Sequence, residues 1–197
     1  NNLISPKAVY GYFNCGRFKN SILLFNENKT EEIAKFHFPR QKSGNNLCIA
    51  DFYCDLVENK PIDFIPMQAV TMGEQASEYS QKLFKEDLYS DYLIFHGLTV
   101  QLSEALAEYT HAKIRIECGF KSFEPKENRQ ILAQKYRGAR YSFGYPACPK
   151  VSDSNTQLKL LEADRINLTM DESEQLHPEQ STTAIVTLHS KAKYFSA

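Results

Sequence analysis

Short runs in which apolar and β-forming residues recur lie near both ends of the chain and predict β-strands. Strands are expected at residues 8–13, 21–25, 32–38, 47–53, 62–70, 166–170 and 182–188. The first two form a hairpin with a longish loop at 14–20. Pro66 marks a bulge or an edge strand, because proline lacks the N–H that a β-ladder needs.

The middle of the chain changes to helical spacing. Thr71 and Glu74 have the spacing of a capping box, which predicts a helix from residue 74 to about 86. A second helix runs from about Ser90 to Cys118, where Gly119 is a suitable stop. Apolar residues recur along it at intervals of three and four, which predicts the buried stripe Leu98, Leu102, Ala105, Leu106 and Tyr109.

Two shorter helices are expected at 125–136, opened by Pro125, and at 155–163. Strands at both ends with helices between them indicate the α+β class. We therefore expect residues 1–197 to form a single domain with a mostly antiparallel, twisted sheet and a central, long helical hairpin.

Charge and composition exclude several classes of protein. The net charge is −1, the pI is about 6.6 and no basic stripe is present, which argues against nucleic-acid binding. No apolar run approaches the ~20 residues that span a bilayer, so no membrane association is expected. The five cysteines form no C-x-x-C pair and are expected to be free thiols in a cytoplasmic protein.

Motifs of common enzyme classes are missing from the sequence. There is no G-x-x-x-x-G-K-[ST], no G-x-G-x-x-G after a strand, no H-E-x-x-H and no G-x-S-x-G. The histidines show no convincing metal-ligand spacing, so no metal site is expected. The residues favour positioning of a ligand over covalent catalysis.

The segment 140–149, Arg-Tyr-Ser-Phe-Gly-Tyr-Pro-Ala-Cys-Pro, is the strongest candidate for a ligand site. Its prolines prevent helix formation, and it combines one fixed cation with three aromatic rings. Such a loop could line a site for a small zwitterionic or anionic ligand. It could equally be a connection whose rings are buried in the core. Cys148, between prolines, is expected to be a structural thiol.

Carboxylates supply the other candidates. Asp51 stands within an apolar run, so its charge needs a partner or lies on the exposed side of an alternating strand. Glu104 and Glu108 share one side of the long helix, where carboxylates usually form a solvated face. Either could instead line a pocket.

Several blocks, in order, resemble the activation domain of cobalamin-dependent methionine synthase. The segment 140–149 resembles its R-x-x-x-G-Y-P-A-C-P signature, and 48–52 is similar to its C-L-A-D-F strand. Residues 105–111 resemble its A-x-A-E-Y-x-H helix, and 189–195 resemble its terminal H-P-x-x-K-Y-[YF]. Ala8–Phe13 and a degraded L-T-E-S segment at 168–173 extend the resemblance over nearly the whole chain.

The resemblance implies a domain that binds S-adenosylmethionine and docks over cobalamin held by another domain of the same or another chain. Flavodoxin or another reductase would supply an electron, and S-adenosylmethionine would supply the methyl group that regenerates methylcobalamin. The matching ligand-site residues are Asp51, Arg140, Gly144, Tyr145, Tyr194 and Phe195, with Glu104, Glu108, Gln134 and Ala147 as possible lining residues.

The resemblance leaves the context open. The chain would be part of a methyltransferase that acts on 5-methyltetrahydrofolate and homocysteine, although the domain itself would not act on homocysteine. The sequence given contains no substrate domain and no cobalamin-binding D-x-H-x-x-G, so it is expected to be either a fragment of a larger enzyme or a stand-alone relative. The alternative is an interaction or sensor module for a corrinoid protein, without methyl transfer of its own.

Overall fold

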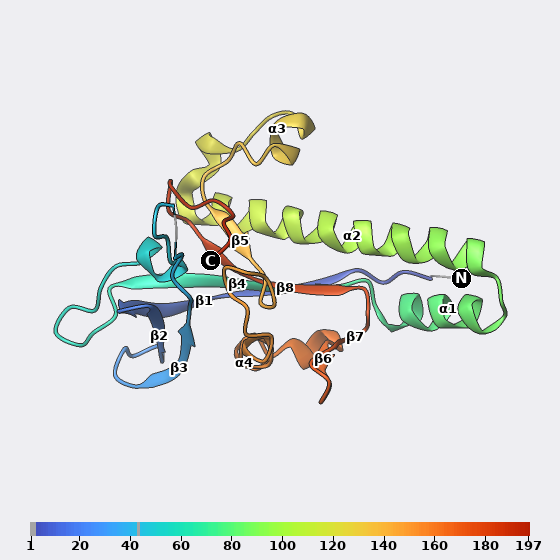
Figure 1. The fold of residues 1–197 in the computed structure, drawn as a ribbon, viewed down its shortest axis with the longest axis horizontal. Helices are drawn as coiled ribbons and strands as arrows, with labels where there is room; N and C mark the ends of the chain where they lie inside the picture. The colour runs from blue at the N-terminus through green and yellow to red at the C-terminus, as the bar shows by residue number, and fades with distance from the viewer. Residues whose placement is uncertain (1–2, 43) are drawn as a thin grey trace. The chain divides into compact units, whose positions relative to one another are not determined.

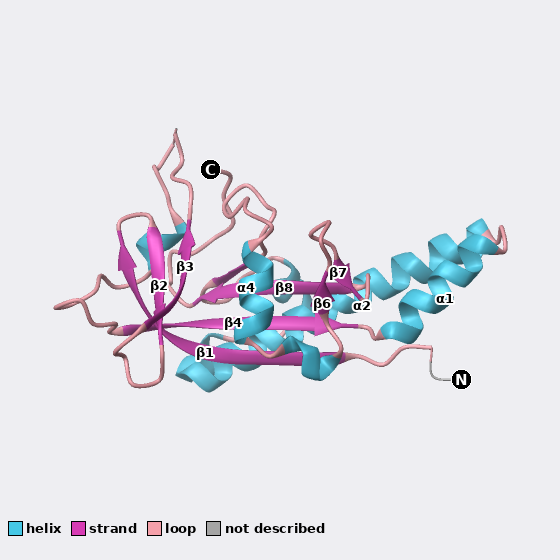
Figure 2. Cartoon of the chain, turned by 90° about the horizontal axis from the view of Figure 1, so that it is seen from below, coloured by secondary structure: helices cyan, strands magenta, loops and turns pink. Residues whose placement is uncertain are grey.

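The computed structural model describes residues 3–42 and 44–197 and contains one six-stranded sheet (Figures 1 and 2). The strand order is β3-β2-β1-β4-β8-β5, and β6 and β7 form a separate two-stranded sheet. The bounds are β1 Lys7–Phe18, β2 Ser21–Phe25, β3 Glu32–His37, β4 Asp63–Thr71, β5 Ala139–Tyr141, β6 Thr169–Met170, β7 Leu176–His177 and β8 Ser181–Thr187. β1 with β2, β2 with β3, and β5 with β8 pair antiparallel.

Four α-helices accompany the strands: α1 Glu74–Lys85, α2 Tyr89–Arg115, α3 Asn128–Leu132 and α4 Asp153–Leu160. Single turns of other helix types lie at η1 Ile49–Phe52, η2 Ile116–Phe120, η3 Lys121–Phe123 and η4 Ala163–Ile166. The expected α+β fold with a long helical hairpin is confirmed. Within the described residues, no helix has both the length and the apolar character needed to cross a membrane.

The chain forms two compact units, each assembled from three segments. The first contains the residues up to Tyr10, then Gln68–Thr110 and Ser154–Thr183. The second contains Gly11–Met67, His111–Asp153 and Ala184–Ala197. Every described contact of the candidate ligand site reported below lies within the second unit.

In the first unit, α1 and the following part of α2 form an antiparallel hairpin (Figure 1). The Tyr79 and Phe95 rings meet edge to face, with centroids 4.8 Å apart. The Gln68 side chain donates to the carbonyl of Ala107 at 2.9 Å, which ties β4 to α2. Ser77 on α1 donates to the side chain of Gln180 at 2.8 Å.

The buried stripe expected on α2 is wrong. Leu98 and Tyr109 are 51% and 69% exposed, whereas the buried positions are the small or polar residues Thr99, Ser103, Ala107 and Thr110. Their hydroxyls bond within the helix; Thr110, for example, donates to the carbonyl of Leu106 at 2.8 Å. Small side chains with satisfied hydroxyls allow a helix backbone to approach its neighbours closely, and here they occupy the inner face.

Several local expectations also differ from the structure. β1 continues to Phe18, so the first hairpin turns at Lys19 and Asn20 and has no long loop. Residues 49–52 form a 3₁₀ turn where a strand was expected. Pro66 lies in β4, which is an interior strand between β1 and β8.

The helix starts differ from their predicted signals as well. Gly73, with φ +90°, is the N-cap of α1, and Thr71 is the last residue of β4, where its hydroxyl accepts from the Gly73 N–H. α3 begins at Asn128 after the N-cap Glu127, not at Pro125. It is therefore much shorter than the 125–136 segment predicted.

Candidate functional site

Strand β5 fixes the backbone of Arg140. Arg140 pairs with Val186 of β8, and its neighbour Tyr141 donates from its hydroxyl to the carbonyl of Lys193 at 2.8 Å. Tyr141 is buried and Arg140 is half-buried. Alternation along the strand therefore directs the arginine to the opposite face from the buried tyrosine.

Gly138 makes this strand pairing possible. Its φ is +88°, and a Cβ at this position would lie 2.3 Å from the carbonyl oxygen of Thr187. Only a residue without a side chain allows β5 to approach β8 this closely. The guanidinium of Arg137, just before it, donates to the carbonyl of Leu188 at 2.9 Å and reinforces the same junction.

The loop after β5 is held by its own backbone. Gly144, with φ +95°, donates its N–H to the carbonyl of Cys148 at 2.9 Å, and the Cys148 N–H donates to Tyr145 at 2.9 Å. The Cys148 thiol donates to the carbonyl of Ser142 at 2.9 Å. The thiol is buried, and burial raises its pKa to about 12, as is typical of a structural cysteine.

The rings of this loop divide between the interior and the surface. Phe143 is buried and packs against Phe36, with ring centroids 5.2 Å apart. Tyr145, by contrast, is 58% exposed. The loop is thus anchored by one ring and presents the other, so neither interpretation of its aromatics from the sequence was complete.

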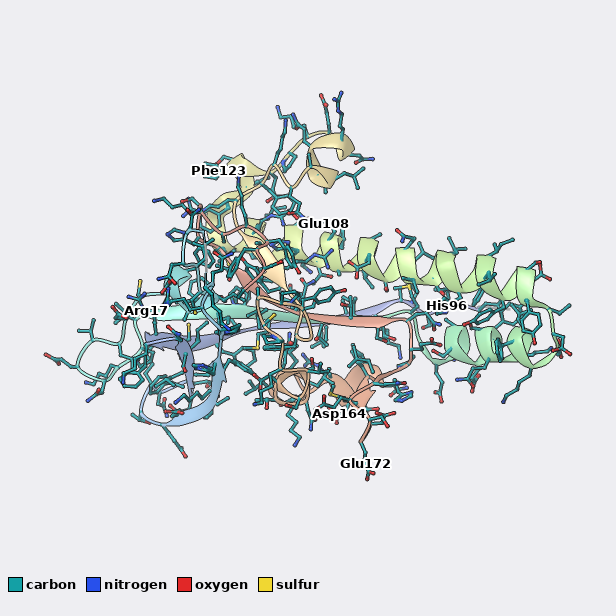
Figure 3. All side chains as sticks on the ribbon, viewed as in Figure 1. Arg17, His96, Glu108, Phe123, Asp164 and Glu172 are labelled. Atoms are coloured by element: carbon teal, nitrogen blue, oxygen red, sulfur yellow. The ribbon has the colours of Figure 1, made fainter. Side chains whose placement is uncertain are left out.

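Asp51 lies on η1 between two arginines. Arg40 donates to both of its carboxylate oxygens, at 2.6 and 2.7 Å, and Arg17 donates at 3.1 Å. Hydrogen bonding from Arg40 is the main cause that lowers the pKa of Asp51. Arg17, labelled in Figure 3, also forms a two-point pair with Asp55 at 2.6 and 2.8 Å. The charge on Asp51 thus has its partners within the protein, as an apolar neighbourhood requires.

The C-terminal tail brings the separate segments together. The buried ring of Phe195 lies edge-on to Phe52, 6.4 Å between centroids, and to Tyr141, at 6.1 Å. Gln41 donates to the carbonyl of Ser196 at 2.6 Å. Phe195 therefore connects η1, which carries Asp51, with β5, which carries Arg140. Tyr194 next to it is 52% exposed.

Arg115, Tyr136 and His111 form a group of ring and ion-pair contacts, and the charge of Arg140 acts on its histidine. The Arg115 guanidinium stacks 3.8 Å from the centre of the Tyr136 ring and donates to both oxygens of Glu124, at 2.6 and 2.8 Å. His111 meets the same ring edge-on at 5.3 Å. Burial, followed by the charges of Arg115 and Arg140, lowers the pKa of His111 well below its usual value. The imidazole is therefore neutral, and it adds no further positive charge next to Arg140.

We expect His111 to make stability depend on pH. The unfolded chain protonates this ring near pH 6.5, whereas the folded chain resists protonation, so the free energy of unfolding falls as pH drops below about 6.5, by up to about 1.4 kcal/mol per pH unit. Denaturation from pH 7.5 to 5 checks this. Because neither ring nitrogen of His111 has a hydrogen-bond partner among the described residues, His111→Phe should fold and flatten the slope. The matched variant His37→Phe, at an exposed position, should keep it; equal slopes in wild type and His111→Phe would contradict the expectation.

The predicted site residues fall into three groups. Asp51, Arg140, Gly144, Tyr145, Tyr194 and Phe195 belong to the second unit, and their segments are linked by the tail contacts. Gln134, exposed with φ +50°, and the fully buried Ala147 belong to the same unit. Glu104 and Glu108 belong to the first unit, on α2, so their part in a pocket stays a prediction.

Sequence reasoning missed Arg17 and Arg40, which hold Asp51 from 34 and 11 residues away. The isolated carboxylate was a signal that a cation must lie nearby, but it did not say which one. Within residues 3–42 and 44–197 no cluster of His, Cys, Asp and Glu could hold a metal ion. The arginine, carboxylate and aromatic side chains described above can form ion pairs with a charged ligand and stack on its rings.

Comparisons with known proteins identify the family of this chain. A sequence profile described as vitamin B12 dependent methionine synthase, activation domain, matches residues 1–197. The chain belongs to this family. Methionine synthase of Mycobacterium tuberculosis (strain ATCC 25618 / H37Rv) is 44% identical over 205 residues, and that of Mycobacterium leprae (strain TN) is 44% identical over 200. These alignments cover 98% and 96% of this chain, and 17% of each relative.

A solved structure of a reactivation domain is similar to this chain over nearly all of its length. The crystal structure of the MetH reactivation domain bound to AdoHcy superposes with a TM-score of 0.89 and 28% identity. The match covers 98% of this chain and 62% of the solved one. This chain thus spans about a sixth of the length of the curated methionine synthases and less than two thirds of the solved chain.

Proposed function

We propose that this activation domain binds S-adenosylmethionine and supports the reductive methylation of cob(II)alamin to methylcobalamin, within a methionine synthase. The observation that supports the proposal is that Arg140, the Gly144 loop and the aromatic tail belong to one unit of this fold, in which the tail residue Phe195 contacts Tyr141, the neighbour of Arg140. The similar MetH reactivation domain was solved with AdoHcy, which is S-adenosylmethionine without its transferable methyl group.

The residues in this unit suit such a ligand. The guanidinium of Arg140 can donate two parallel hydrogen bonds to the methionyl carboxylate. The exposed rings of Tyr145 and Tyr194 can pack against the adenine or face the sulfonium, whose positive charge is attracted by an aromatic face. The left-handed backbone at Gly144 allows the loop to approach a ligand without a Cβ in the way.

Asp51 and Phe195 take more indirect parts. Three of the acceptor sites on Asp51 are occupied by Arg40 and Arg17, which leaves one direction for the ligand's ammonium or ribose hydroxyls. The buried Phe195 packs against both Phe52 of η1 and Tyr141 of β5. Its main contribution is therefore to position Asp51 and Arg140. Phe195 has no side-chain hydroxyl, so it can contribute packing but no hydrogen bond to a ligand.

The domain's own task is binding and orientation. In the overall reaction one electron reduces cob(II)alamin, and the methyl group leaves the sulfonium for cobalt, giving methylcobalamin and S-adenosylhomocysteine. No residue of this chain is proposed to form a covalent bond to the methyl group. The site fixes the sulfonium so that its methyl group faces the corrin, which a cobalamin-binding domain presents. Flavodoxin or another reductase is the proposed electron donor.

A reconstituted assay tests the proposal. The domain is mixed with a cobalamin-binding domain loaded with cob(II)alamin, reduced flavodoxin and S-adenosylmethionine carrying a labelled methyl group. We expect the absorbance of methylcobalamin to appear together with transfer of the label, and neither to appear when this domain is omitted. If calorimetry detects S-adenosylmethionine binding but no label reaches cobalt, the domain is a sensor or interaction module. If no binding is detected at millimolar ligand, the proposed site itself is wrong.

A further inference from the structure

The outer side of α2 in the first unit carries a row of exposed apolar residues, which we call the α2 stripe: Ile94, Leu98, Leu102, Ala105 and Tyr109. Ile94 is 71% exposed and Leu102 is 37% exposed. Figure 3 shows side chains standing out from the side of α2 that faces away from α1, along the stretch between the labelled His96 and Glu108. A continuous exposed apolar row of this kind marks an interaction surface more often than a solvated one.

The inner side of the same helix makes the stripe unusual. Thr99, Ser103 and Ala107 lie on the buried face, whereas larger apolar side chains such as Ile94 and Leu98 are exposed. An ordinary surface helix has the reverse arrangement, with apolar residues inside and polar residues outside. A helix with small residues on its buried side and an apolar stripe on its exposed side can pack against other elements on both sides.

The spacing of the stripe defines the shape of what covers it. Successive members are four, four, three and four residues apart, the pattern of a seam between two helices. From Ile94 to Tyr109 the stripe is about 22 Å long at ~1.5 Å per residue, the length of a helix of about four turns. It offers side chains without a free strand edge, so a helix suits it and an added β-strand does not.

The similar proteins contain chain that could supply this helix. The MetH reactivation domain extends beyond the part matched here, because this chain covers 62% of it, and the curated methionine synthases are several times longer. We propose that the α2 stripe is the binding site for an amphipathic helix, which comes from the part of a methionine synthase chain that adjoins the region matched by these 197 residues. The proposal does not depend on the ligand of the other unit.

Peptides test the proposal directly. The probes are labelled peptides of about 25 residues, enough to cover a four-turn seam, which tile the stretches of the M. tuberculosis methionine synthase that adjoin its matched region. Each is added to the full 197-residue chain, and binding is followed by fluorescence anisotropy and far-UV circular dichroism. One amphipathic peptide is expected to bind and to gain helix. The double variant Leu98→Gln/Leu102→Gln is expected to weaken its binding at least tenfold.

A matched control separates the stripe from general surface stickiness. Ile62 and Leu132 are 56% and 85% exposed in the second unit, and Ile62→Gln/Leu132→Gln should leave the peptide affinity unchanged. Both double variants should fold, because each replaced side chain is at least one third exposed, and thermal melting of both checks this. The proposal is overturned if none of the peptides binds, or if both double variants lose the same amount of peptide affinity. A dimer in solution that Leu98→Gln/Leu102→Gln converts to monomer also overturns it, since a second copy would then be the occupant.

Discussion

Replacing Arg140 with alanine is expected to weaken S-adenosylmethionine binding by about 2–3 kcal/mol, roughly 30- to 150-fold, because the ligand carboxylate loses its forked cationic partner. The thermal stabilisation that the ligand gives to the wild type should then disappear at ligand concentrations near the wild-type Kd. Titration calorimetry measures the affinity, and differential scanning fluorimetry measures the shift in Tm.

Two further variants decide whether the fork matters. Arg140→Lys keeps the positive charge but loses the planar pair of donors, so an intermediate affinity is expected. Arg129→Ala removes an arginine from the exposed side of α3 and should bind as tightly as the wild type. An Arg140→Ala protein that folds and still binds with wild-type affinity would remove Arg140 from the site.

Local patterns account for the parts of the fold that could be predicted. The runs that became β2, β3, β4 and β8 are short stretches in which apolar and β-forming residues recur, and such patterns depend on neighbours in sequence. Residues 49–52 are equally apolar but form a 3₁₀ turn. That turn is fixed by the Asp51–Arg40 and Asp51–Arg17 contacts, which the local pattern does not contain.

The long helix illustrates a different limit. Periodicity located α2 and showed which of its apolar residues share one side. It does not show whether that side is buried or exposed, and the expected burial was wrong. The buried side was decided by small residues, such as Ser103 and Ala107, that score low in hydrophobicity and allow close approach. Leu98 and Leu102 were therefore assigned to the core when they lie on the surface.

For the candidate site, the sequence identified the residues that belong to the 140–149 motif. Arg140 and Tyr145 belong to a recognisable block, and the structure places that block on a strand and a tight loop. The anchoring role of Phe195 was not predictable, because it depends on contacts with Phe52 and Tyr141 far away in sequence. The same holds for the neutral His111, whose state is set by burial and by two arginines.

The backbone that carries Arg140 should be the most sensitive part of the second unit. Gly138→Ala places a methyl group where the carbonyl oxygen of Thr187 now lies 2.3 Å away, and it does so at a φ of +88°. The carbonyl belongs to the β8 backbone and cannot rotate aside as a side chain would, so β5 must separate from β8. Ligand affinity should also fall, because Arg140 follows two residues later on β5.

Gly119→Ala is the matched comparison, because Gly119 has the same φ of +88° but open space around its Cβ position. It should lose about 1 kcal/mol from backbone strain alone. Gly138→Ala carries the same strain plus overpacking, so we expect a loss of about 3–4 kcal/mol and a Tm lower by roughly 8–14 °C. Urea denaturation of both variants measures the difference, which isolates the close approach of β5 to β8. Equal losses would mean that the strands separate easily and that Gly138 serves the turn without holding Arg140 in place.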